Sequence, residues 1–342
     1  VFLWKTLNNG VIILLCGGRE EIQVMELKKV VLSSGITLVI VVLLLVSLAG
    51  YFAGGYFVDL ALKRGNAQDP KAPPAACVSI LDPNVQLPSK PDAVSENWQM
   101  ISADGLKLTA THFHPVHEGH RWVILVHGYG RNQQNTWDYA AAYLEHGYEV
   151  LTPDLRASGD SEGTYLTMGA LEGQDIEKWV EKIAAEDPQA KIVLHGVSMG
   201  AATVMLASAQ QDMPDNLAAV IEDCGYTSAD KMFAMQLKNL FDLPSFPLID
   251  CMDIMSRRKT GVSLSAAAPI KAVQKTRVPM LFIHGDADKL VPYEMMQELY
   301  DACGAPVKEK VTVKGASHAE AKSADPQAYY RVVFGFANRY TG

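Results

Sequence analysis

The chain has 342 residues, 49% hydrophobic and 20% charged, with a formal net charge of −8. This composition supports a sizeable core and excludes wholesale disorder, and the acidic balance disfavours a general nucleic-acid binder, which is usually basic. The five cysteines form no CxxC pair, so a zinc ribbon, a thioredoxin-like site and a disulfide scaffold have no support.

Residues 1–24 precede Met25, which opens the sequence Met-Glu-Leu-Lys-Lys. A short charged stretch before an apolar run is typical of the start of a signal or anchor segment. Arg19-Glu20-Glu21 can be encoded by purine-rich codons, as in a bacterial ribosome-binding site. We therefore interpret residues 1–24 as a translated leader and expect the natural protein to start at Met25.

Residues 30–53 carry no charged side chain, and about 20 apolar residues suffice for a helix to cross a bilayer. We predict a membrane anchor over residues 25–62, with a single transmembrane helix. The short N-terminal tail favours an uncleaved signal-anchor with the bulk of the chain outside the cytoplasm. Cleavage after Ala49 remains the alternative, because Ser47-Leu48-Ala49 has the small-x-small pattern of a signal-peptide site.

Residues 63–96 are rich in proline and poor in large apolar side chains, which is typical of a linker. The folded domain is expected over residues 97–342. It opens with two alternating segments around Asp104-Gly105, a pattern that predicts a β-hairpin.

Short apolar runs then alternate with helix-like segments, which predicts a mostly parallel sheet covered on both faces. The expected strands are residues 122–126, 148–152, 191–194, 217–221, 278–283 and 307–313. The expected helices are residues 137–146, 171–185, 199–210, 294–303 and 326–340. In such a sheet, chemistry is located beyond the carboxyl ends of the strands.

The pattern Gly-x-Ser-x-Gly occurs twice, around Ser161 and around Ser198. A nucleophile on a sharp turn needs a strand before it and a helix after it. Ser198 has both, whereas Ser161 follows a loop and no helix starts beside it. We predict Ser198 as the nucleophile and Ser161 as a turn residue with a satisfied hydroxyl group.

Residues 97–342 resemble the α/β-hydrolase family, and most closely its membrane-anchored bacterial members of the serine-aminopeptidase-like or Bem46-like subgroup. The matching motifs are His127-Gly128-Tyr129-Gly130, residues 154–163, the elbow at Ser198, residues 284–292 and Gly315-Ala-Ser-His318. The resemblance implies a catalytic triad in the chain order Ser, Asp, His. It also implies that the interruption of the strand rhythm at about 224–272 is a helical cap over the nucleophile.

His318 is the candidate base, because it alone among the histidines lies late in the chain in a loop after the last strand. The resemblance selects Asp288 over Asp286 as the acid that orients His318. The backbone N–H groups of Met199 and Tyr129 are the expected oxyanion hole.

Four other histidines, His112, His114, His117 and His120, lie in or beside the first hairpin. Their spacing suggests a metal site, but no second ligand cluster accompanies them in the sequence. We therefore interpret them as solvated surface and expect neither a metal nor a cofactor.

These features predict a membrane-bound serine hydrolase that cleaves carboxylic esters through an acyl-enzyme. Methionine and phenylalanine side chains in the cap favour an apolar acyl or small aromatic ester. A peptidase, an aminopeptidase or an acyltransferase could use the same triad. A membrane-tethered binding protein on a hydrolase scaffold is the alternative outside enzymes.

Overall fold

The computed structural model describes residues 6–7, 11–12, 20–65 and 87–342. Most of the leader expected at 1–24, and most of the linker expected at 63–96, lie outside the described residues. The chain divides into two compact units, Val1–Phe52 and Ala53–Gly342.

The first unit contains the antiparallel pair β1 (Thr6–Leu7) and β2 (Val11–Ile12) and most of helix α1 (Glu20–Leu62). The apolar side chains of α1 from Ile36 to Phe52 are largely exposed. Within the described part of the chain, Ser34–Leu62 is the one helix long and apolar enough to cross a membrane.

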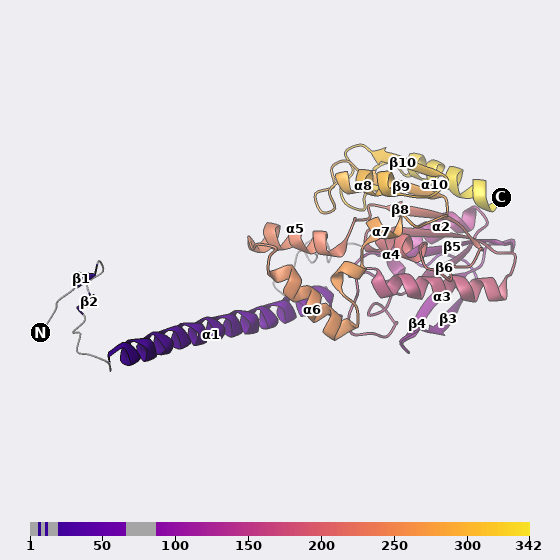
Figure 1. The fold of residues 1–342 in the computed structure, drawn as a ribbon. Helices are drawn as coiled ribbons and strands as arrows, with labels where there is room; N and C mark the ends of the chain where they lie inside the picture. The colour runs from indigo at the N-terminus through magenta and orange to yellow at the C-terminus, as the bar shows by residue number, and fades with distance from the viewer. Residues whose placement is uncertain (1–5, 8–10, 13–19, 66–86) are drawn as a thin grey trace, which may run out of the picture. The chain divides into compact units, whose positions relative to one another are not determined.

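The second unit is built on an eight-stranded sheet of order β10-β9-β8-β7-β5-β6-β4-β3 (Figure 1). The strands are β3 (Ser95–Ile101), β4 (Lys107–Phe113), β5 (Arg121–Val126), β6 (Glu149–Pro153), β7 (Lys191–Val197), β8 (Leu217–Asp223), β9 (Met280–Gly285) and β10 (Lys308–Val313). β3 and β4 form the predicted antiparallel hairpin, and β4 is antiparallel to β6. Strands β5 to β10 are parallel to one another, as the alternation of short apolar runs and helix-like segments predicts.

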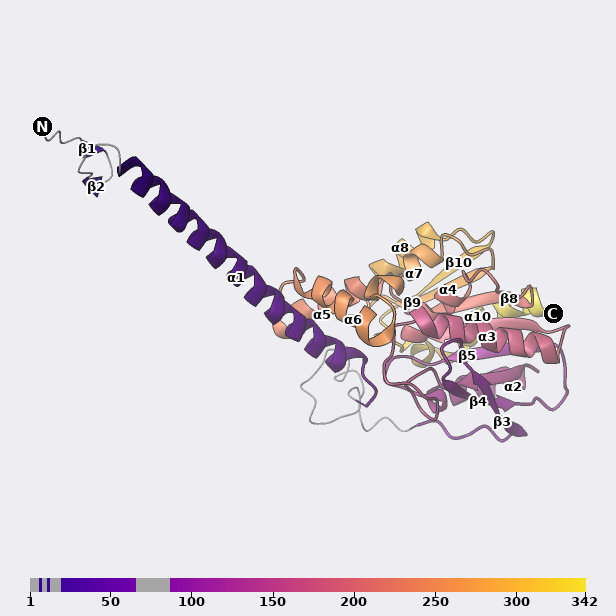
Figure 2. The same cartoon turned by 60° about the horizontal axis from the view of Figure 1, so that its bottom comes forward.

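Helices cover both faces of this sheet (Figure 2). They are η3 (Gln133–Thr136), α2 (Trp137–Glu145), α3 (Ala170–Glu186), α4 (Met199–Ala207), α8 (Glu294–Ala302), α9 (Ala321–Ala324) and α10 (Pro326–Thr341). Side chains of β5 alternate between two core clusters. Trp122, Ile124 and Val126 belong to the cluster that includes residues of α3 and α4. Val123 and Leu125 belong to the cluster that includes residues of α2 and α10. Burial on both faces is why these strands read as unbroken apolar runs.

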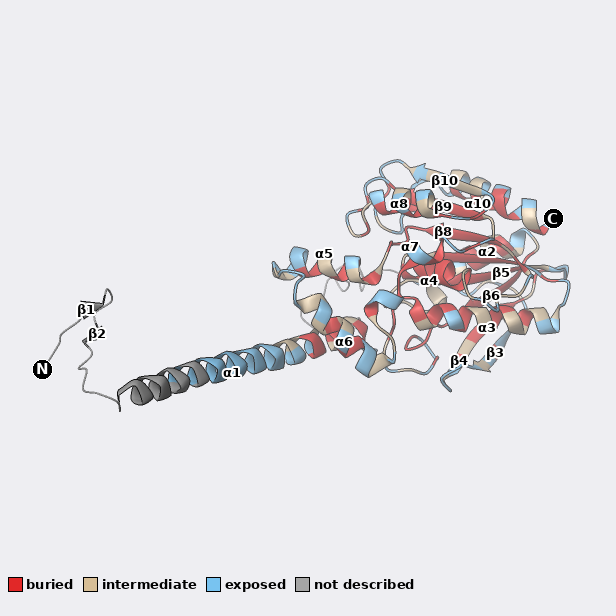
Figure 3. Ribbon diagram, in the orientation of Figure 1, coloured by how far each residue is buried: buried red, intermediate tan, exposed pale blue. Residues whose placement is uncertain are grey.

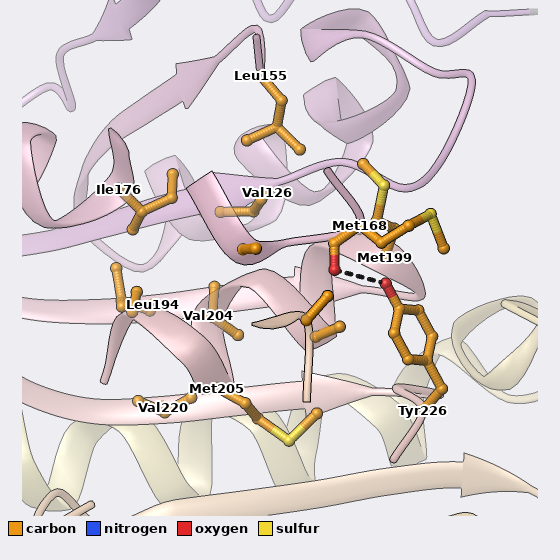
Figure 4. Packing of buried hydrophobic residues seen from close by; sticks show 14 of the residues in the cluster. Val126, Leu155, Met168, Ile176, Leu194, Met199, Val204, Met205, Val220 and Tyr226 are labelled. Atoms are coloured by element: carbon orange, nitrogen blue, oxygen red, sulfur yellow. Dashed lines mark hydrogen bonds between the residues drawn. The ribbon is translucent and has the colours of Figure 1, made fainter. Parts of the chain in front are cut away.

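Helix α4 is the most deeply enclosed helix of the sheet region (Figure 3), and every one of its residues is buried. In the close-up, Val204 of α4 packs near Leu194 and Val220 of the sheet, and the Tyr226 hydroxyl donates to the Met168 carbonyl (Figure 4). The helix that follows Ser198 is therefore fixed by apolar packing on all sides. It ends at Ala207, earlier than the expected residue 210, and continues as a turn.

The interruption after β8 forms α5 (Ala229–Phe241), α6 (Leu248–Thr260), η4 (Leu264–Ala266) and α7 (Pro269–Ala272). Pro244 lies between α5 and α6, and Pro247 directly precedes α6. Both prolines therefore separate helices, as expected from a residue that has no N–H to donate.

The end of α1 belongs to the second unit, which begins at Ala53, whereas the sequence predicts a folded domain over residues 97–342. Val58 and Leu62 are fully buried in its core. Gly54 packs so closely against α6 that an added Cβ would lie 2.6 Å from the Cys251 carbonyl oxygen. The sequence pattern does not indicate this packing, because an apolar helix face has the same composition whether it contacts lipid or protein.

We predict that a chain starting at Ala53 folds, whereas one starting at Pro91 is strongly destabilised. The shorter chain loses Val58, Leu60 and Leu62, which are buried. Burying each such side chain contributes roughly 1.5–3 kcal/mol, against a net stability of about 5–15 kcal/mol. Thermal unfolding of the two fragments measures the difference, and equal melting temperatures would contradict the assignment.

A point variant in the full-length chain tests the same packing. Gly54→Ala should destabilise the protein by about 1–3 kcal/mol, since Cβ would overlap the backbone of Cys251. Gly35→Ala is the matched control in the same helix, because nothing lies within 4 Å of its added Cβ. Equal effects of the two variants would argue against a docked helix end.

Candidate active site

Ser198 lies between β7 and α4 in a backbone conformation that L-residues rarely adopt, with φ 58° and ψ −118°. A strand–turn–helix arrangement with this strain exposes a serine hydroxyl at the carboxyl end of a sheet. The Ser198 N–H donates to the Asp223 carbonyl of the neighbouring strand at 2.8 Å. The turn is thereby tied to β8.

Two glycines make this turn possible. An added Cβ on Gly196 would lie 2.1 Å from the Gly200 carbonyl oxygen, and one on Gly200 would lie 2.1 Å from the Val126 carbonyl oxygen. Any larger residue at either position would push the start of α4 away from β5 and β7. The Gly-x-Ser-x-Gly spacing therefore has a direct steric cause.

Ser198, His318 and Asp288 form one chain of hydrogen bonds. The distance from Ser198 Oγ to His318 Nε2 is 2.8 Å, and that from His318 Nδ1 to Asp288 Oδ2 is 2.7 Å. The three side chains come from separate segments that follow β7, β10 and β9. The parallel sheet brings these segments together at its carboxyl edge.

The Asp288 carboxylate is buried and fully engaged. Its Oδ1 accepts the backbone N–H groups of Leu290 at 2.9 Å and Val291 at 3.0 Å. Burial alone would raise the pKa of Asp288, but the hydrogen bonds from His284 and His318 and the His318 charge hold it well below the usual range. Asp288 is thus kept as an anion that faces His318.

Asp286 has a different position. Its Oδ1 accepts the backbone N–H of Gly315 at 2.5 Å, which joins the turn after β9 to the turn after β10. Asp286 thus stabilises the loop, while Asp288 faces His318.

His284, near the end of β9, supports Asp288 directly. Its Nε2 lies 3.2 Å from Asp288 Oδ2 and 3.0 Å from the Val291 carbonyl oxygen. Because both neighbours are acceptors, Nε2 carries the proton. Burial lowers the pKa of His284, but Asp288 and Glu222 raise it, and the net shift is upward. The His-Gly-x-x-Asp spacing is the sequence feature that could have indicated a contact between His284 and Asp288.

Ser161 is a satisfied turn residue, as predicted. Its hydroxyl donates to the Asp154 carbonyl at 2.7 Å and accepts the Thr109 N–H at 2.9 Å. Ser161 is also buried, so its hydroxyl is not presented to a substrate.

The two residues expected to supply oxyanion donors lie beside Ser198. Met199 is the first residue of α4. Tyr129 follows Gly128, whose added Cβ would lie 3.4 Å from Ser198 Cβ. The Tyr129 hydroxyl donates to the Ala61 carbonyl at the end of α1.

The apolar residues of the cap divide into two groups. Several are buried in the main core and attach the cap to the sheet: Met232, Phe233, Leu237, Met252 and Met255. Others remain exposed, most of all Phe246 at 77% and Ile254 at 56%. Met235, Phe241, Leu248 and Ile249 are intermediate, because they are partly buried against the same core.

One interpretation of the histidines is wrong. His112 is not solvated surface, because it is 3% exposed and lies between the carboxylates of Glu96 and Glu149. Both acidic residues are distant from His112 in the sequence. The sheet register brings them together, and no local pattern could have indicated this.

Comparison with known proteins defines the class. Residues 123–332 match the Alpha/beta hydrolase family, so the chain belongs to this family. The uncharacterized protein YqkD of Bacillus subtilis is 28% identical over 233 residues, which cover 68% of this chain and 75% of YqkD. Human monoglyceride lipase is 23% identical over 252 residues, covering 64% of this chain and 82% of the lipase.

A solved structure supports the same fold. The chain is similar to the esterase Pf2001 of Pyrococcus furiosus, with a TM-score of 0.60 and 24% identity, covering 73% of this chain and 94% of the esterase. The α/β-hydrolase fold deduced from the motifs is therefore confirmed, including its mostly parallel sheet.

Asp288→Asn should slow the reaction of Ser198 with a fluorophosphonate probe by at least about 100-fold. The asparagine would favour the wrong His318 tautomer, and the corresponding change in a serine-protease triad costs about 10⁴ in kcat. Asp286→Asn is the matched control and should change the rate only slightly. Intact-protein mass spectrometry measures the labelling. Equal losses in the two variants would leave Asp288 without a special role.

Proposed function

We propose that this protein is a serine hydrolase that cleaves carboxylic esters with apolar acyl or small aromatic groups. The observation that carries the proposal is the unbroken chain Ser198–His318–Asp288, with Ser198 at the strained turn before α4. A serine hydroxyl is a weak nucleophile unless a base accepts its proton. The partly buried imidazole of His318, oriented by Asp288 and 2.8 Å from Ser198 Oγ, supplies that base.

The proposed reaction has two stages. His318 takes the Ser198 proton while the oxygen attacks the ester carbonyl, and the N–H groups of Met199 and Tyr129 stabilise the developing oxyanion. His318 then gives the proton to the leaving alcohol, which produces the acyl-enzyme. Water, deprotonated by His318, attacks this ester and releases the acid and free Ser198. Asp288 holds the His318 tautomer and stabilises the imidazolium.

We favour an ester over other acyl substrates because the chain is similar to an esterase and to a monoglyceride lipase. The apolar preference rests on the many methionine and phenylalanine side chains of the cap segment. A peptidase or an acyltransferase would use the same three side chains. Rates on matched ester, thioester and aminoacyl amide substrates separate these reactions.

Ser198→Ala should abolish ester turnover, because the acyl-enzyme can no longer form. Ser161→Ala should keep most of it, although it loses two hydrogen bonds in the loop. Hydrolysis of a chromogenic ester by the two folded variants measures the contrast. A wild-type protein that neither turns over esters nor reacts with a fluorophosphonate would instead favour a binding protein.

We also propose that α1 anchors the protein in the cell membrane with the hydrolase unit outside the cytoplasm. The exposed apolar surface of α1 up to Phe52 and the lysine pair Lys28-Lys29 support this topology.

Protease added to intact cells or protoplasts should therefore remove the hydrolase unit, while a cytoplasmic marker protein stays intact. Immunoblotting of the membrane fraction with an antibody against the unit measures the loss. Protection until lysis would place the unit in the cytoplasm. Recovery of a shortened protein from the medium would indicate cleavage after Ala49.

A further inference from the structure

Four titratable side chains meet on the sheet at a place separate from Ser198. Glu96 lies on β3, His112 on β4, His114 directly after β4, and Glu149 at the start of β6. The register pairs Glu96 with His112, and His114 lies one position beyond the pair of Phe113 with Val150. The cluster is therefore at the amino end of the parallel strand β6, whereas Ser198 follows the carboxyl end of β7.

Glu149 contacts both imidazole rings. Its Oε2 lies 2.9 Å from His112 Nε2 and 3.3 Å from His114 Nδ1. Glu149 is buried, so its charge needs donors. When these two nitrogens carry the protons, Glu149 accepts the hydrogen bond of His112, and its Oε2 lies 3.3 Å from the protonated Nδ1 of His114. The carboxylate thereby favours this tautomer of both histidines.

In these tautomers, the unprotonated nitrogens are His112 Nδ1 and His114 Nε2. The lone pairs of both nitrogens face Glu96 Oε1. Glu96 Oε1 lies 3.3 Å from His112 Nδ1 and 3.7 Å from His114 Nε2. A lone pair opposite a carboxylate oxygen is repulsive unless a proton or a cation lies between them. With both histidines neutral the cluster carries two negative charges, which one divalent cation would neutralise.

The spacing and the surroundings fit a metal ion. One ligand atom from each of Glu96, His112 and His114 lies within 4.8 Å of the others. Ligand atoms that lie about 2.1 Å from a tetrahedral metal ion are about 3.4 Å from one another. The distances from Glu96 Oε1 to His112 Nδ1 and His114 Nε2, 3.3 and 3.7 Å, are close to this value. The Trp98 indole donates to Glu96 Oε1 at 2.9 Å and holds the carboxylate, and Trp122 stacks on His112.

We propose that Glu96, His112 and His114 bind a divalent transition-metal ion of the Zn²⁺ class. Glu149 acts as the outer carboxylate that orients both rings, an arrangement common around metal-bound histidines. Water completes the coordination, since the Glu96 and His114 side chains are 56% and 26% exposed. The ion connects the edge strand β3 to β4, and Glu149 extends that connection to β6.

The test is a Zn²⁺ titration of the full-length chain in detergent after removal of metals with a chelator. Calorimetry should show one Zn²⁺ bound per chain, and Zn²⁺ should raise the unfolding temperature. Glu96→Gln and His114→Asn should each weaken binding at least tenfold and abolish the temperature shift. Circular dichroism checks that these variants are folded. If Glu96→Gln does not fold, His114→Asn alone tests the proposal.

His117→Ala is the matched control, because His117 is an exposed histidine of the same segment. It should bind Zn²⁺ like the wild type. Ligand atoms of Cys224, Asp288 and His318 also lie within 4.8 Å of one another. Zn²⁺ binding that survives in His114→Asn but is lost in His318→Ala would place the ion at that second group and overturn the proposal. Absence of stoichiometric binding by the wild type would overturn it as well.

Discussion

The close crossing of backbone between β5, β7 and the start of α4 is the constraint on which the site depends. Gly196 and Gly200 have no room for a side chain, and this contact forces Ser198 to a positive φ. A residue held in such a conformation costs on the order of 1–3 kcal/mol and persists only when its surroundings determine it. Here the surroundings are the fully buried helix α4 and the bond from Ser198 N–H to β8. The position of Ser198 Oγ fixed in this way is 2.8 Å from His318 Nε2, and His318 Nδ1 is in turn 2.7 Å from Asp288 Oδ2.

Two buried carboxyl groups, those of Glu222 and Asp223, lie at the carboxyl end of β8, next to the turn that holds Ser198. Burial raises the pKa of Glu222 to about 8 and that of Asp223 to about 6, despite the Tyr329 hydroxyl that donates to Asp223 at 2.8 Å. Burial thus favours the neutral form of Glu222. Asp288 differs because two backbone N–H groups and two histidines stabilise its charged form. The environment therefore keeps the negative charge where His318 can use it.

The sequence predicted those features that arise from local pattern. Unbroken apolar runs indicated β5 to β9, because these strands are buried on both faces, whereas the edge strand β10 is only partly buried. The surrounding strand and helix separated Ser198 from Ser161. Features that arise from tertiary contacts were missed. Val58 and Leu62 look like membrane residues in the sequence yet are buried in the hydrolase unit. His112 looks like a surface residue, because nothing local shows that β3 and β6 place a carboxylate on either side of it.

The end of α1 links the anchor segment to the loops of the site. The Ala61 carbonyl accepts the Tyr129 hydroxyl, so the loop proposed to supply an oxyanion donor is tied to this helix end. Arg64 donates to the carbonyls of Gly159 and Ser161, both at 2.5 Å, and thereby ties the loop after β6 to the same segment. On the other side, Lys259 of α6 pairs with Asp59. The end of this helix is therefore bonded to the cap through Asp59 and to two loops at the carboxyl edge of the sheet, so residues 53–65 are part of the second unit.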